Sequence, residues 1–120
     1  MAASFEVELS MAEAPSDAQG RAVSALEEAA RTVGLRLTKR AAGRLEYRPR
    51  VQFPFLIMLY HTLSGERMTV SFEPGSSGGT RVLIRGAVAR SRQAVAADPD
   101  HWSEALGASV APARPGDDGP

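Results

Sequence analysis

Residues 66–88 read ERMTVSFEPGSSGGTRVLIRGAV and contain the clearest pattern in the chain. Met68, Val70 and Phe72 alternate with polar residues, and Val82 and Ile84 resume the alternation after a glycine-rich loop at positions 74–79. Alternation with a period of two on both sides of a loop is typical of an antiparallel hairpin with one buried face. The segment therefore predicts two paired strands in the C-terminal half of the chain.

Further strands are predicted on both sides of the early helix and before this hairpin. Residues 5–9 alternate cleanly, residues 35–38 and 45–48 predict a second hairpin, and residues 55–62 (FLIMLYHT) are apolar on both faces. The alternating strands share one apolar face, which needs a covering layer. Its members are Phe5, Val7, Leu9, Leu35, Leu37, Leu45, Tyr47, Met68, Val70, Phe72, Val82 and Ile84.

Two helical regions are available to cover that face. The first is predicted to begin with Ser16 as N-cap and Gln19 completing a capping box, and to end at Gly34. The second spans residues 89–106 and restarts at Asp98, which precedes a proline in the first helical position, before Gly107 ends it. The predicted fold class is therefore α+β, with the element order β-α-β-β-β-β-β-α. We expect a curved antiparallel sheet of about six strands with two helices on one face.

Composition limits the class of protein further. The chain has 120 residues, 43% of them hydrophobic, and a formal net charge of zero, which indicates a soluble globular protein. We expect a single domain over residues 1–107 and a disordered tail over residues 108–120. The absence of cysteine excludes disulfides and thiolate metal sites. No secretory signal or membrane-length apolar run is present, which favours a cytoplasmic location, and the strong preference for arginine over lysine is typical of a GC-rich bacterial genome.

The late hairpin also carries a family resemblance. Glu73 and Pro74, followed across the loop by Gly79, Thr80 and the two residues after it, resemble the corresponding hairpin of the helix-grip superfamily (START and Bet v 1-like, SRPBCC) in a reduced size. The resemblance implies a cavity between the sheet and the C-terminal helix that often holds an apolar ligand, and it implies no particular reaction. A smaller fold of similar element order, such as the TATA-binding-protein type, is an open alternative.

Residues that could support catalysis are sparse, which favours a non-enzymatic domain over an enzyme. His61 and His101 lie in different elements without a second ligand at metal spacing, so we expect structural or surface roles for them and no metal site. The glycine-rich loop joins two strands and lacks the lysine of a phosphate-binding loop. We expect no cofactor.

The strongest functional indication is the apolar segment at residues 53–60. One face of this strand has no evident cover, and an exposed apolar patch usually marks a ligand or partner site. We therefore predict binding of an apolar small molecule between sheet and helix, or a homodimer formed through residues 53–60. The candidate ligand-binding residues are Tyr47, Phe55, Ile57, Met58, Tyr60, Met68, Phe72 and Trp102.

Segregated charge supports a second hypothesis from a different class. Residues 31–92 carry twelve basic and three acidic side chains, whereas both ends of the chain are acidic. This pattern predicts either cross-strand ion pairs, with Glu6 and Glu8 near Arg81 and Arg85, or an adaptor surface for nucleic acid or an acidic partner. The candidate surface consists of Arg36, Arg40, Arg48, Arg67, Arg81 and Arg85. The lack of exposed aromatic residues on that face argues against nucleic acid.

Overall fold

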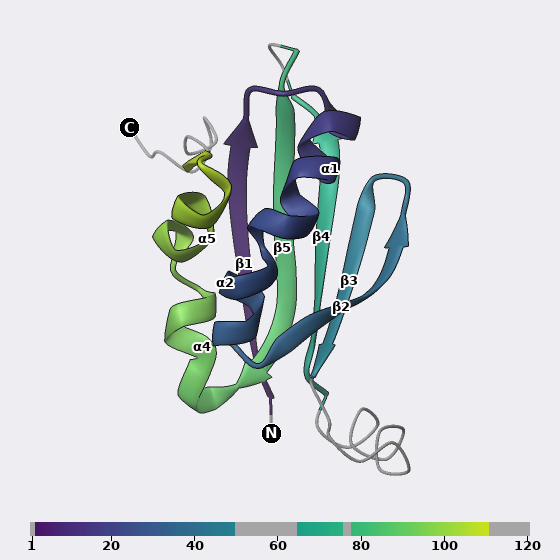
Figure 1. Cartoon of the computed structure of the whole chain (residues 1–120). Coiled ribbons are helices and arrows are strands. Elements are labelled where there is room, and N and C mark those ends of the chain that lie inside the picture. Colours follow the sequence, from purple (N-terminus) through teal and green to yellow (C-terminus); the bar gives the residue numbers. More distant parts are fainter. Residues whose placement is uncertain (1, 50–64, 76–77, 111–120) are drawn as a thin grey trace, which may run out of the picture.

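A computed structural model describes residues 2–49, 65–75 and 78–110 and shows an α+β protein, as predicted (Figure 1). All its strands belong to one antiparallel sheet, in the order β2-β3-β4-β5-β1-β6. In chain order the elements are β1 (Ala2–Met11), α1 (Pro15–Ala25), α2 (Glu27–Thr32), β2 (Leu35–Ala41), β3 (Arg44–Pro49), β4 (Arg67–Pro74), β5 (Thr80–Ala89), α4 (Arg90–Ala96), α5 (Pro99–Leu106) and β6 (Ser109–Val110).

The helices cover one face of the sheet, with α1 and α2 crossing its middle and α4 and α5 lying beside β1 (Figure 1). The predicted apolar face is the sheet side of this core. Eleven of its twelve members are buried, and the twelfth, Leu37, is partly buried against the same cluster. Burial of an aliphatic or aromatic side chain contributes about 1.5–3 kcal/mol, so this shared face is the main source of stability.

The hairpin of β4 and β5 forms, with the buried face that its alternation predicts. Val70 lies opposite Ile84 and Phe72 opposite Val82, so the inward residues of both strands meet in the core. Gly86 lies opposite Met68 and Phe5, and a Cβ atom there would lie 2.1 Å from the carbonyl oxygen of Arg67. Only a glycine allows this close approach of two strands, which is typical of a bend in a sheet.

The N-terminal helical region differs from the prediction in two ways. It forms two helices, α1 and α2, that meet at Leu26, and the N-cap of α1 is Ala14 rather than Ser16. Because Pro15 lacks an N–H group and fits the first helical position, the cap moves to the residue before it. No capping box forms, because the side chain of Gln19 bonds to the β2–β3 turn instead.

The C-terminal helices follow the prediction closely. Asp98 caps α5, with its Oδ1 atom accepting a hydrogen bond from the N–H of Asp100 at 3.0 Å, and Gly107 ends the helix with a φ of 62°. Trp102 is fully buried, donates from Nε1 to the carbonyl of Ala96 at 2.7 Å, and stacks on Phe5 with ring centroids 6.4 Å apart. These contacts close α4 and α5 onto β1.

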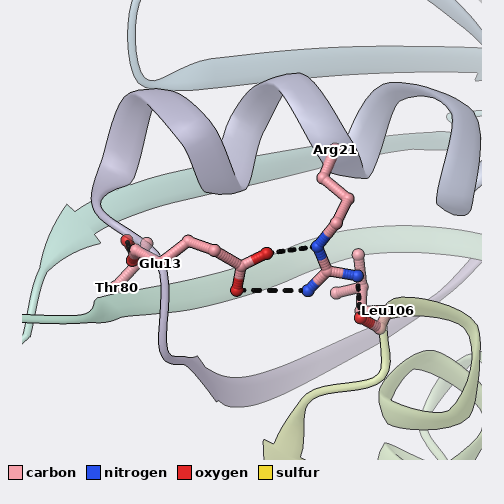
Figure 2. Close-up of polar contacts among 4 residues, drawn as sticks. All are labelled: Glu13, Arg21, Thr80 and Leu106. Carbon is pink, nitrogen blue, oxygen red and sulfur yellow. Dashed lines mark hydrogen bonds and ion pairs between the residues drawn. The ribbon is translucent and has the colours of Figure 1, made fainter.

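A polar cluster fastens α1 to the loop before it and to the end of α5 (Figure 2). Arg21 of α1 bonds to both carboxylate oxygens of Glu13 and donates to the carbonyl of Leu106 at the end of α5. Thr80 donates to the backbone carbonyl of Glu13 at 2.6 Å. The hydrogen bond from Arg21 lowers the pKa of the Glu13 carboxyl. The cluster therefore links the first loop, α5 and the start of β5.

The sixth strand differs from the one expected. Ser109 and Val110 pair with Ser10 and Leu9 of β1, so the segment expected to be a disordered tail from residue 108 begins with a short edge strand. The predicted strand at residues 55–62 lies outside the described residues, as do residues 111–120. Within the described ranges, no helix is long and apolar enough to cross a membrane.

Candidate ligand cleft

An open cleft of about 340 Å³ lies between the α1–α2 segment and the β2–β3 hairpin. The volume is within the range of sites that bind small molecules. Five apolar side chains and three charged ones line it, from α1 (Val23), α2 (Glu27, Ala30, Arg31), β2 (Leu35, Arg36, Leu37) and β3 (Tyr47).

Two local features hold the walls of the cleft in place. At one end, Gln19 of α1 donates to the carbonyl of Ala41 at 2.7 Å and accepts from the N–H of Gly43 at 2.8 Å, so the β2–β3 turn is fastened to α1. At the other end, Gly34 adopts a φ of 82° and turns the chain directly from α2 into β2. The hairpin is thus attached to the helices at both ends, and the cleft lies between these attachments.

Among the residues that line the cleft, Tyr47 carries a buried hydroxyl group. The side chain is 1% exposed, and its hydroxyl has no hydrogen-bond partner among the described residues. Burial raises the pKa of this phenol to about 12, so the group is a neutral hydroxyl at physiological pH. A buried polar group without a partner is unfavourable, and such groups are few in native proteins.

The charged residues at the cleft are unequally paired. Arg31 lies 3.2 Å from Glu27 and 2.8 Å from Glu28, so these three side chains form a surface ion-pair cluster along α2. Arg36 of β2 has no ion-pair partner within the described part of the chain, and its neighbour across the strands is another arginine, Arg48. Among the charged residues that line the cleft, Arg36 is therefore the one without an ion-pair partner in the described part of the chain.

The predicted ligand-binding residues separate into three groups. Tyr47 lines the cleft. Met68, Phe72 and Trp102 are buried in the hydrophobic core and line neither of the two clefts described here. The remaining four, Phe55, Ile57, Met58 and Tyr60, lie outside the described residues.

The predicted arginine surface divides between two halves of the sheet. The expected cross-strand pairs form: Arg85 lies 2.9 Å from Glu6 and Arg81 lies 3.2 Å from Glu8. Arg67 donates to the carbonyl of Gly65. By contrast, Arg36, Arg40 and Arg48 of the β2–β3 hairpin form no ion pair among residues 2–49, 65–75 and 78–110.

A second, shallower cleft of about 460 Å³ crosses β1, β3, β4 and β5. Its charged residues include Arg85 and Glu6, which pair with each other, and Arg44, which lies 3.1 Å from Glu46. The lining also includes Arg67, which donates to the carbonyl of Gly65 and has no acidic partner among the described residues.

Sequence reasoning found Tyr47 and Arg36 but assigned them to different hypotheses, and it did not connect them with Val23, Ala30 or Leu37. All three carried a detectable signal, because Leu37 belongs to the predicted apolar face of the strands and Val23 and Ala30 recur at helical spacing in the first predicted helix. Periodicity predicts that a face is buried against something, but not that two buried faces will leave a space between them.

The described histidine has a structural contact. A ring nitrogen of His101 lies 3.0 Å from the carbonyl oxygen of Ala29, and the ring packs edge-on against Trp102. His101 thus joins α5 to α2. Within the described ranges, no group of three or more metal-binding side chains occurs. No protein-family model, curated protein or solved structure matches the chain.

Proposed function

We propose that the protein binds a small, largely apolar molecule in the cleft between α2 and the β2–β3 hairpin. The observation that carries this proposal is Tyr47, which lines the cleft and whose buried hydroxyl has no hydrogen-bond partner among the described residues. A ligand with one polar atom near this hydroxyl and an apolar body against Leu35, Leu37 and Ala30 would satisfy it.

Two further observations support a binding site over a packing defect. The cleft is open to solvent, so a ligand could enter without unfolding the core. Both its walls are fastened, by Gln19 at the turn and by the short connection at Gly34, so its shape does not depend on the ligand. Preformed apolar clefts with a few polar groups are the usual form of small-molecule sites.

The proposal differs from the cavity that the helix-grip resemblance implied. That cavity would lie between the sheet and the C-terminal helix, where Trp102 and Leu106 are fully buried. Neither cleft described here is lined by residues of α4 or α5. We therefore place the ligand at the opposite helical pair.

The test uses a variant that fills the cleft and a matched control. Val23→Phe adds an aromatic ring inside the cleft, whereas Val95→Phe makes the same change on α4, where Val95 is 40% exposed and lines neither cleft. Native mass spectrometry of the purified protein should detect a copurified adduct, and ligand-observed NMR with a library of small apolar molecules should detect binding. Both signals should be lost in Val23→Phe and kept in Val95→Phe. Equal binding by the two folded variants would refute the proposed site.

A further inference from the structure

We infer that the ligand of this cleft is an amphipathic anion, whose acidic headgroup pairs with Arg36 at the mouth while its apolar body occupies the interior. This inference rests on the proposed function and adds the chemical class of the ligand. It is drawn from the charges around the cleft, which the proposed function does not use.

The charged side chains that line the cleft are Glu27, Arg31 and Arg36. Arg31 and Glu27 neutralise each other, with Glu28 as a further partner of Arg31. Arg36 remains, with an exposed guanidinium and no carboxylate partner among the described residues. An anion entering the cleft would therefore meet one lining cation, Arg36, that has no acidic partner among the described residues.

The β2–β3 hairpin, which forms one wall of the cleft, is rich in positively charged side chains. Arg36 lies directly opposite Arg48 in the β2–β3 register, and like charges at opposed positions destabilise a sheet. Lys39 and Arg40 add two more cations, and within the described residues only Arg44 of this hairpin has an acidic partner, Glu46. An anion bound at Arg36 would relieve this repulsion.

The contrast with the rest of the sheet shows that this imbalance is local. In the β1–β5 pair, each outward arginine has a glutamate across from it or beside it, at 2.9 Å for Arg85 and Glu6 and 3.2 Å for Arg81 and Glu8. Among the described residues, three of the four sheet arginines without an acidic partner, Arg36, Arg40 and Arg48, thus lie on the hairpin that forms one wall of this cleft. Guanidinium groups favour carboxylate, sulfonate and phosphate oxygens because they can donate two parallel hydrogen bonds.

The ligand body is defined by the remaining lining. Val23, Ala30, Leu35 and Leu37 offer only hydrocarbon, and the hydroxyl of Tyr47 can donate one hydrogen bond to an acceptor on the ligand. The cleft therefore suits a short acyl chain or a small ring system with one acidic group.

The test compares octanoate with octan-1-ol, which share a chain and differ in the charge of the headgroup. In two-dimensional NMR titrations, octanoate should bind about tenfold more tightly than the alcohol, because a charge-assisted hydrogen bond is worth at least that factor. Arg36→Gln should reduce octanoate binding to the level of the alcohol. Arg40→Gln removes the same charge from the same strand but does not line the cleft, and should change the affinity by about twofold or less, because exposed charges at a distance are screened.

Three outcomes would overturn the inference, and they are distinguishable. If octanol binds as tightly as octanoate, and Arg36→Gln changes neither, the headgroup assignment fails while the apolar site stands. If a single-stranded oligothymidylate binds and both arginine variants weaken it equally, the hairpin recognises polyanions instead. If octanoate does not bind, the anionic class is wrong, and the library screen with Val23→Phe decides separately whether the cleft is a site.

Discussion

Removal of a single oxygen atom, in Tyr47→Phe, should make the ligand-free protein more stable. The Tyr47 hydroxyl is buried and has no hydrogen-bond partner among the described residues, whereas water would satisfy it in the unfolded chain. Leaving such a group unsatisfied costs about 1–3 kcal/mol, and phenylalanine removes the group without changing the ring. We expect a gain of about 1–2 kcal/mol. For a domain of this length, each kcal/mol raises Tm by about 4 °C.

Tyr47→Phe should also change how the free energy of unfolding depends on pH in the alkaline range. The pKa of Tyr47 rises from 10.0 to about 12 on folding because burial disfavours the phenolate. The folded state therefore keeps its proton between about pH 10 and pH 12 while the unfolded state releases it, so wild-type stability falls across this window. Each pKa unit corresponds to about 1.4 kcal/mol, so this loss is at most about 3 kcal/mol. Tyr47→Phe should lack it.

Urea denaturation followed by circular dichroism, at pH 7 and across the alkaline window, measures both effects. Tyr60→Phe leaves Tyr47 as the sole tyrosine, so tyrosinate absorbance in that variant reports the pKa of Tyr47 directly. Destabilisation of Tyr47→Phe by about 1 kcal/mol or more at pH 7 would show that the hydroxyl has a partner that stabilises it. In that case the reasoning behind the proposed site would be wrong. A pKa near 10 for Tyr47 would refute the alkaline prediction.

Three other perturbations test the framework around the cleft. Trp102→Phe should destabilise the protein by about 2–4 kcal/mol in urea denaturation, because it opens a cavity and leaves the carbonyl of Ala96 without its donor; a loss below 1 kcal/mol would contradict the packing described. Gln19→Ala removes both bonds to the β2–β3 turn, so hydrogen exchange in that turn should accelerate and stability should fall by about 1–3 kcal/mol; unchanged exchange would show that the turn is held by other contacts. The pKa of Glu13 is lowered on folding, so its contribution is present above pH 4.5 and is lost as the pH falls through the folded-state value; acid titrations of stability should be less steep in Glu13→Gln, and identical slopes would argue against the ion pair.

The sequence alone determined most of the secondary structure and the composition of the core. Alternation in residues 66–88 predicted the β4–β5 hairpin and its buried face, and the residues flanking Pro99 predicted the start of α5. These features depend on neighbours in the chain, because a strand exposes alternate residues to the same face and a cap bonds to an amide two residues away. Such information is local and can be read without a tertiary structure.

Tertiary structure decided the features that depend on distant residues. Gln19 fits a capping box in sequence, but it bonds to a turn more than twenty residues away, because that turn is brought to the first turns of α1 only by folding. Ser109 and Val110 have little to bury, yet they pair with β1 because α5 delivers them to a free strand edge. The cleft also depends on residues that are distant in the sequence. The apolar faces of α2 and β2 were both predictable, but the space between them arises from the way the helices cross the sheet, and side-chain periodicity contains no information about that crossing.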